Sequence, residues 1–318
     1  MQGCITDMID RFGVVILDGG MATELERCGT DLSDPLWSAR VLIETPDLIE
    51  LVHYNYFVAG ADVGTSASYQ ATFQRFVDRG IGQKEAADLM QLSVQLARDA
   101  RERFWDDTDN RKGRSYPLVA ASVGSYGAYL ADGSEYRGDY GLSARRLLDF
   151  HRPRLEVLVD SGADILAFET IPCAREAEAL VRLLEDFPHI PAWICFSCCD
   201  EIHVCHGEPL SDCVAVANDA PSCAAVGVNC TPPRYVVDLL RSVRDVTSKP
   251  LVAYPNSGEV WDAAQHCWIG GPDPVDFAEA AQQWYEAGAR LVGGCCRTTP
   301  DTILGLTLCL RNGSEPEK

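Results

Sequence analysis

The sequence predicts an α/β fold, a (β/α)8 TIM barrel formed by a single domain. Short apolar runs bounded by Gly or Pro alternate with helical patterns along the chain, and eight such runs occur. A joint in which a glycine ends a helix just before the next run recurs at 59–63, 161–165 and 287–291. Eight repeated βα units close naturally into a barrel.

The expected strands are rich in Val, Ile, Leu and Ala, a pattern typical of parallel strands that are buried on both faces. An open doubly wound sheet would give the same pattern, and in both folds the chemistry lies at the carboxyl ends of the strands. The eight strands are expected at 14–20, 61–68, 118–124, 163–170, 192–198, 224–230, 251–257 and 290–296.

Helical patterns fill the segments between these runs. Pro232, Pro274 and Pro300 suit the first turn of their helices, where the missing N–H costs nothing. No Gly/Ser/Pro-rich linker divides the chain, so we expect residues 1–318 to form one domain with a core from about 12 to about 310. The helices are expected at 46–59, 82–105, 143–161, 175–187, 210–220, 232–246, 274–287 and 300–310.

Composition and charge limit the class of protein. The net charge of −20 and the pI near 4.6 argue against nucleic acid or an anionic membrane as a partner. No apolar run approaches the roughly 18 residues that span a bilayer, and the N-terminus lacks the pattern of a signal peptide. The 14 cysteines lie mostly inside strand-like runs. We therefore expect a soluble, cytoplasmic protein with reduced thiols.

Three cysteines fall at the ends of expected strands. Cys230 ends the sixth run, and Cys295 and Cys296 end the eighth. Adjacent cysteines are often small core residues, but a catalytic zinc site also needs three protein ligands and one open position. Neighbours on a strand point to opposite faces, so both thiols reach one ion only if the backbone turns, which Gly293 and Gly294 permit. We expect Zn²⁺ on Cys230, Cys295 and Cys296.

Carboxylates at other strand ends indicate the substrate. A thiol in the open position would bind as a thiolate, and this anionic site would favour attack on a cationic carbon donor. Asp18 and Glu169 end the first and fourth runs. Each could simply cap a helix or a loop amide, but together, opposite the thiols, they fit the ammonium of an amino-acid thiol. No histidine at this rim stands in an arrangement typical of nucleophilic hydrolysis.

Two further groups of residues have a structural and a functional interpretation. The aromatic residues Trp37, Tyr69 and Tyr126 are either core residues or lie near a sulfonium that they attract by cation–π interaction. A local Cys/His cluster could be a second zinc site, but it has no second Cys-x2-Cys pair, so we interpret its thiols as structural. This cluster consists of Cys195, Cys198, Cys199, His203, Cys205 and His206.

With these residues in hand, the chain resembles the zinc-dependent homocysteine S-methyltransferase family from about Phe12 to about Leu310. It looks most similar to the short plant and bacterial enzymes that use S-methylmethionine, or more weakly S-adenosylmethionine. The Cys-rich loop 198–205 departs from the glycine- and asparagine-rich loop that the resemblance to the plant enzymes implies, and this leaves the donor preference open. The motifs that carry the resemblance are 17–23 (LDGGMAT), 68–72 (SYQAT), 124–130 (GSYGAYL), 133–138 (GSEYRG), 168–172 (FETIP), 227–233 (GVNCTPP), 254–259 (YPNSGE) and 293–299 (GGCCRTT).

The resemblance implies a (β/α)8 barrel that transfers a methyl group to the thiolate of L-homocysteine and gives methionine. It implies Zn²⁺ on Cys230, Cys295 and Cys296. Homocysteine and a sulfonium donor would be the small-molecule partners of a monomer or small homo-oligomer, with no nucleic acid and no membrane. The substrate-binding residues expected at the rim are Asp18, Gly19, Gly20, Glu169, Asn229, Trp37 and Tyr69.

Three alternatives remain open from the sequence. One is a selenocysteine Se-methyltransferase, since a selenol ionises more easily than a thiol. Another is a non-catalytic zinc- or thiol-binding protein, which would engage the Cys195 to His206 cluster as well. The third is a redox protein with a vicinal disulfide between Cys295 and Cys296.

Overall fold

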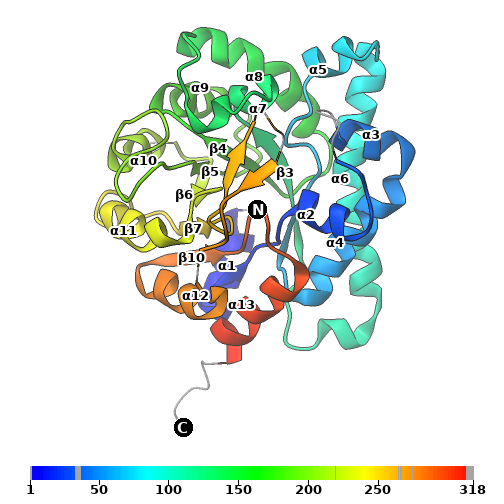
Figure 1. The fold of residues 1–318 in the computed structure, drawn as a ribbon. Coiled ribbons are helices and arrows are strands. Elements are labelled where there is room, and N and C mark those ends of the chain that lie inside the picture. Colours follow the sequence, from blue (N-terminus) through cyan, green and yellow to red (C-terminus); the bar gives the residue numbers. More distant parts are fainter. Residues whose placement is uncertain are drawn as a thin grey trace.

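Eight parallel strands form a barrel at the centre of the protein, with helices around it (Figure 1). The computed structural model describes residues 2–32, 37–218, 220–263, 265, 267–273 and 275–312. The strand order around the sheet is β1-β10-β7-β6-β5-β4-β3-β2. These strands are β1 (Val15–Ile16), β2 (Val63–Thr65), β3 (Leu118–Gly124), β4 (Ile165–Ile171), β5 (Ala192–Phe196), β6 (Cys223–Asn229), β7 (Leu251–Tyr254) and β10 (Ala289–Val292).

The sheet closes on itself between β1 and β2. Leu17, directly after β1, forms a parallel bridge with Val63 of β2. One step earlier the Asp62 amide donates a hydrogen bond to the Ile16 carbonyl at 2.7 Å. The expected closed barrel is therefore confirmed, and the open doubly wound sheet is excluded.

Each expected helix is present, with small shifts at its ends. The eight are α4 (Pro46–Ala59), α6 (Gln83–Asp106), α8 (Ala144–Leu158), α9 (Ala174–Leu184), α10 (Leu210–Asn218), α11 (Pro233–Val243), α12 (Phe277–Glu286) and α13 (Pro300–Asn312). Shorter elements that the sequence did not predict are α1 (Gln2–Phe12), α2 (Met21–Arg27), α3 (Trp37–Glu44), α5 (Phe73–Asp78), η1 (Thr108–Arg111), α7 (Tyr126–Leu130) and η2 (Ser134–Tyr136). Within the described residues, no helix combines the length and apolarity needed to cross a bilayer.

The start of α12 differs from the expectation. The helix begins at Phe277 rather than at 274, because Asp276 caps it. The Asp276 carboxylate accepts hydrogen bonds from the amides of Ala278 at 2.8 Å and Glu279 at 3.2 Å. Pro274 itself lies outside the described residues.

Side chains on the strands alternate between the barrel interior and the layer of helices. Val15 and Leu17 belong to the interior cluster, and Ile16 packs in the outer cluster against the helices. The interior is filled from its amino end by α1, whose Ile5 and Met8 are 3% and 4% exposed and pack on the interior cluster. With its amino end filled by α1, the barrel is expected to carry its site at the carboxyl end.

An antiparallel hairpin that the sequence did not predict follows β7. It consists of β8 (Val260–Asp262) and β9 (Cys267–Ile269). In Figure 1 the hairpin forms the orange arrows in front of the barrel. A segment inserted at this point extends the carboxyl end of the barrel, where chemistry is expected.

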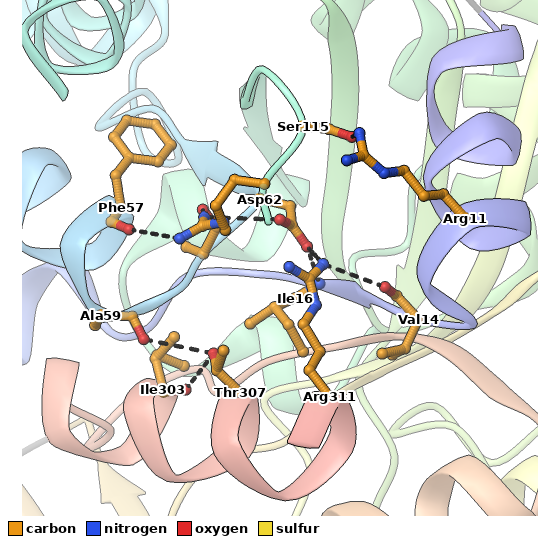
Figure 2. Close-up of polar contacts among 12 residues, drawn as sticks. Arg11, Val14, Ile16, Phe57, Ala59, Asp62, Ser115, Ile303, Thr307 and Arg311 are labelled. Carbon is orange, nitrogen blue, oxygen red and sulfur yellow. Dashed lines mark hydrogen bonds and ion pairs between the residues drawn. The ribbon is translucent and has the colours of Figure 1, made fainter. Parts of the chain in front are cut away.

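A buried ion cluster closes the opposite, amino end of the barrel (Figure 2). Asp62, just before β2, is fully buried, and its carboxylate accepts from the Ile16 amide at 2.8 Å and from the Arg311 guanidinium of α13. Arg114 lies 3.6 Å from the same carboxylate and donates to the Ala61 carbonyl at 2.6 Å. One carboxylate thus joins the first two strands to the last helix.

His53 on α4 should make the protein sensitive to acid. It is fully buried, and neither ring nitrogen has a hydrogen-bond partner among the described residues. Burial lowers its pKa from 6.5 to about 3, so its contribution to stability is complete above pH 6.5 and is lost as the pH falls toward 3. Between pH 8 and pH 5, the free energy of unfolding of His53→Leu should fall by about 2 kcal/mol less than that of wild type. Urea unfolding at both pH values tests this, and equal losses in the two proteins would contradict it.

Candidate metal and substrate site

Three cysteine sulfurs meet at the carboxyl end of the barrel. The sulfurs of Cys230, Cys295 and Cys296 all lie within 4.8 Å of one another. Cys230 follows β6, and Cys295 and Cys296 follow β10, so the thiols come from the two strands on either side of β7. The sequence-based expectation that both adjacent thiols reach one point is met.

The end of β7 holds both cysteine-bearing segments in place. The Tyr254 carbonyl accepts from the Cys230 amide at 3.1 Å, and the Pro255 carbonyl accepts from the Cys295 amide at 2.7 Å. Slightly further along, the Ser257 amide donates to the Cys296 carbonyl at 3.2 Å. Backbone contacts therefore fix the three sulfurs relative to one another.

The two glycines before the thiols allow close packing. A Cβ on Gly293 would lie 2.7 Å from Leu17 Cβ and 2.9 Å from the Asp18 carbonyl oxygen, which is too close. Neither Gly293 nor Gly294 has a positive φ; the left-handed residues are instead Cys230 at 46° and Arg297 at 67°. The chain turns after Cys296, while the glycines let β10 approach the end of β1.

The spacing of the sulfurs fits a tetrahedral metal site. Bonds of about 2.3 Å to zinc at the tetrahedral angle place two sulfurs about 3.8 Å apart. Cys296 Sγ lies 3.7 Å from Cys230 Sγ and 3.8 Å from Cys295 Sγ. Cys230 and Cys295 are paired as a disulfide, with Cys296 free, so these two must be reduced before they can act as ligands. The vicinal Cys295–Cys296 disulfide considered above is therefore wrong.

Asp18 lies at the end of β1 in a complete set of hydrogen bonds. Its carboxylate accepts from the Thr65 amide at 2.6 Å, the Thr65 hydroxyl at 3.1 Å and the Tyr254 hydroxyl at 2.5 Å. Burial raises the pKa of Asp18 to about 6, although these hydrogen bonds oppose the rise. The carboxylate is held rigidly in place and faces the barrel end.

Glu169, near the end of β4, uses only one of its two carboxylate oxygens in a hydrogen bond with described residues. Its Oε2 accepts from the Ser122 hydroxyl at 2.7 Å, while Oε1 is buried without a hydrogen-bond partner among the described residues. Burial raises the pKa of Glu169 to about 8, and the nearby negative charge of Asp18 contributes to the rise. An unpaired buried carboxylate oxygen is costly, so this atom is ready to accept a hydrogen bond from a ligand.

The match of the chain to a protein family supports the functional interpretation of these thiols and carboxylates. The model of the homocysteine S-methyltransferase family matches residues 15–310. The chain belongs to the homocysteine S-methyltransferase family. It is similar to homocysteine S-methyltransferase YbgG of Bacillus subtilis, at 50% identity over 94% of this chain and 95% of that protein. It is also 49% identical to homocysteine S-methyltransferase 1 of Zea mays, over 98% of each chain.

A solved structure agrees with the sequence relatives. The metallated form of the homocysteine methyltransferase MmuM from Escherichia coli superposes with a TM-score of 0.86 at 46% identity. The superposition covers 95% of this chain and 98% of that one. The barrel of the homocysteine S-methyltransferase family is therefore present over almost the whole chain.

Two of the expected substrate-binding residues form hydrogen bonds with other residues of the protein. Asn229 accepts from the Thr170 amide at 2.7 Å and donates to the Thr170 hydroxyl at 2.9 Å. Its amide therefore holds Thr170, whose φ is 57°, next to Glu169. Gly20 donates its amide to Thr298 at 3.1 Å and accepts from the Tyr56 hydroxyl at 3.0 Å. Both residues position the site through their neighbours.

The three aromatic candidates differ in where the structure places their side chains. Burial raises the pKa of Tyr69 well above 10 and the charges of Glu135, Cys296 and Glu169 contribute, while a side-chain hydrogen bond with Thr170 opposes the rise. This hydrogen bond brings the Tyr69 hydroxyl next to Thr170, the neighbour of Glu169. Tyr126 instead packs on Tyr129, Tyr140 and Phe150, with ring centroids 4.8 to 5.5 Å apart, outside the group of thiols and carboxylates. Trp37 begins α3, but its side chain lies outside the described part of the structure.

The Cys/His cluster does not form a second metal site. Across the described residues, the three thiols above make up the one group of His, Cys, Asp or Glu with metal-binding geometry. Cys195 is buried in the barrel interior, and the His203 and His206 side chains pair with Asp200 and Glu208. The interpretation of these thiols as structural stays a prediction.

Two residues near the thiols were missed by sequence reasoning. Glu135 and Tyr136 lie on η2, in the loop after β3. Burial raises the pKa of Tyr136, and the charges of Cys296, Tyr69 and Glu135 contribute. The Ser197 hydroxyl, directly after β5, donates to the Glu135 carbonyl and so holds η2 at the carboxyl end of the barrel. Glu135 and Tyr136 both stand within the family motif 133–138, which was the available signal; their direction could not be predicted because they lie beyond the strand end.

The β8–β9 hairpin connects opposite sides of the barrel end. At its base Glu259 pairs with Arg297 at 2.9 Å, directly after Cys296. Near its tip Ala263 packs on Gly133, where an added Cβ would lie only 3.1 Å from the Ala263 Cβ. The hairpin therefore reaches from the thiols to the loop that carries Glu135 and helps to shield the site from water.

Proposed function

We propose that this protein transfers a methyl group from S-methylmethionine, or more weakly from S-adenosylmethionine, to the sulfur of L-homocysteine. The observation that supports this most directly is the convergence of three thiols with Asp18 and the half-paired Glu169. The relatives named above, which act on homocysteine by their names, support the same activity.

Zinc is the metal that these residues fit. The Cys296 sulfur lies 3.7 and 3.8 Å from the other two sulfurs, the spacing of a tetrahedral site, and the three cysteines once reduced offer the soft thiolate ligands that favour zinc. Cys230, Cys295 and Cys296 would hold the ion and leave one position open. When bound, zinc would lower the pKa of a substrate thiol so that it reacts as a thiolate at neutral pH. The metallated form of the E. coli relative supports a metal here.

The carboxylates would orient homocysteine. Oε1 of Glu169 would accept a hydrogen bond from the substrate ammonium, with Asp18 adding negative charge from a position fixed by Thr65 and Tyr254. Gly19 follows Asp18, and no hydrogen bond between described residues uses its amide, so it remains the backbone donor in this proposal. Asn229 would help to position this group by holding Thr170. Tyr69 would contribute to the same part of the site.

The reaction exchanges one carbon–sulfur bond of the methyl group for another. The homocysteine sulfur, after losing its proton to solvent, forms a bond to the methyl carbon. The bond from that carbon to the sulfonium sulfur breaks, and its electron pair stays on the departing sulfur, so both products are methionine when S-methylmethionine is the donor. Alignment of the two sulfurs by the protein would supply most of the rate increase.

A zinc count coupled to an activity assay tests the proposal. Reduced protein should bind one zinc per chain and form methionine from homocysteine, fastest with S-methylmethionine, more slowly with S-adenosylmethionine and not with betaine. Full activity in zinc-free protein, or no methionine with any donor, would contradict the proposal. Selenocysteine in place of homocysteine tests the remaining enzyme alternative, and more than one zinc per chain would favour a zinc-storage role.

The expected location and assembly stay part of the proposal. The many free cysteines among the described residues are consistent with a reducing cytoplasm. A monomer or small homo-oligomer is expected, and sedimentation of the purified protein would distinguish them.

A further inference from the structure

Glu135 is a buried carboxylate without a counterion. It is 8% exposed, and its Oε2 has no hydrogen-bond partner among the described residues. The cation nearest in sequence, Arg137, is engaged elsewhere: it donates to the Ser134 hydroxyl at 3.0 Å and lies 3.6 Å from Asp132. Leaving a carboxylate oxygen buried and unpaired costs free energy, so such an atom in a site calls for a missing partner.

Glu135 lies at the carboxyl end of the barrel. It stands on η2 in the loop after β3, and the Ser197 hydroxyl, directly after β5, donates a hydrogen bond to its carbonyl. Burial raises the pKa of Tyr69, and the negative charge of Glu135 contributes to this rise. Glu135 therefore belongs to the same end of the barrel as the thiols.

Glu135 and Glu169 lie on different elements. Glu169 belongs to β4 in the barrel wall, and Glu135 belongs to η2 in the loop after β3. Each has one buried carboxylate oxygen without a hydrogen-bond partner among the described residues. The site therefore offers two separate acceptors, one for each of two ammonium groups.

The backbone around Glu135 is firmly fixed. The Ser197 hydroxyl at the end of β5 donates to the Glu135 carbonyl at 2.9 Å. Gly127 packs so closely that an added Cβ would lie 2.2 Å from the Glu135 amide nitrogen. The hairpin residue Ala263 rests on Gly133, two positions before Glu135. The unpaired oxygen is therefore presented in a defined position.

We propose that Glu135 binds the α-ammonium group of the methyl donor. The inference rests on the proposed function, in which homocysteine and S-methylmethionine are both α-amino acids whose sulfurs must meet at the thiols. Glu169 with Asp18 serves the ammonium of homocysteine. Glu135, on a separate element, serves the ammonium of the donor, so the two amino acids approach with their sulfur atoms facing each other. Donors with an α-ammonium are thereby favoured over sulfonium compounds without one.

The test compares two sulfonium compounds, measured by calorimetry with zinc-loaded protein in the absence of homocysteine. Wild type should bind S-methylmethionine about 10- to 100-fold more tightly than dimethylsulfoniopropionate, which has a sulfonium but no ammonium. Glu135→Gln should lose this preference by weakening S-methylmethionine alone. Glu201→Gln, which removes an exposed carboxylate from the loop after β5, should keep it.

Steady-state kinetics with the matched variant Glu169→Gln assigns the two carboxylates. Glu135→Gln should raise the KM for S-methylmethionine and leave that for homocysteine unchanged, while Glu169→Gln should do the reverse. Equal losses for both sulfonium compounds, or a raised homocysteine KM in Glu135→Gln with normal zinc content and melting temperature, would overturn the proposal. If wild type forms no methionine, the proposed function fails, but the calorimetry still decides the role of Glu135.

Discussion

Cys296→Ser should lose both its zinc and its methyl transfer activity. Cys296 Sγ lies 3.7 and 3.8 Å from the other two sulfurs, so it completes the three-thiol set. Changing residues that only support a metal ligand lowers metal affinity or activity by about 10- to 100-fold, so losing a ligand should cost more than about 100-fold. Zinc content by elemental analysis and methionine formation from homocysteine measure the two losses on the same sample.

Cys28→Ser is the matched control. Cys28 is a free, exposed cysteine directly after α2 and does not belong to the group of three thiols, so this variant removes one thiol outside that group. It should keep wild-type zinc content and activity. All samples must be reduced before loading, since Cys230 and Cys295 are paired in the structure. A zinc-free Cys296→Ser that still forms methionine at the wild-type rate would refute the metal-dependent mechanism.

The barrel strands could be predicted because of where they lie. Parallel strands covered by helices are buried on both faces, so β3 and β4 appear as continuous apolar runs in the sequence. The β8–β9 hairpin gives no such signal, because it is solvent-exposed or half-buried along its length. α1 did carry a signal: Ile5, Met8, Ile9 and Phe12 follow helical spacing and pack on the barrel interior.

The sequence predicts those site residues that lie near strand ends, because the barrel fixes where the strand ends are. Cys230, Asp18 and Glu169 all lie within two residues of the end of a strand, and the barrel brings such residues together. Glu135 lies further out in a loop, where its direction depends on Gly127, Ser197 and the hairpin. Those contacts come from distant parts of the chain, so the sequence contains the residue but not its orientation.

Asp62→Ala should destabilise the protein by about 3–5 kcal/mol, because it leaves two buried or half-buried arginines without their counterion. The Asp62 side chain is 0% exposed, that of Arg311 11% and that of Arg114 14%. Little water is available to solvate the guanidinium groups once the carboxylate is gone. Urea unfolding of wild type and variant at neutral pH measures the difference in free energy.

Asp149→Ala provides the comparison. Asp149 pairs with Arg145 at 3.1 Å on the outside of α8, where the side chains are 52% and 79% exposed, so its loss should cost less than about 0.5 kcal/mol. Both variants remove one aspartate that pairs with arginine, but Asp62 is also buried, lies near a second arginine and accepts a hydrogen bond from the Ile16 amide. Equal destabilisation would show that the Asp62 cluster is no more than an ordinary surface pair. A large difference would show that closing the barrel depends on this carboxylate, since it joins β1, β2 and α13 at the end opposite the thiols.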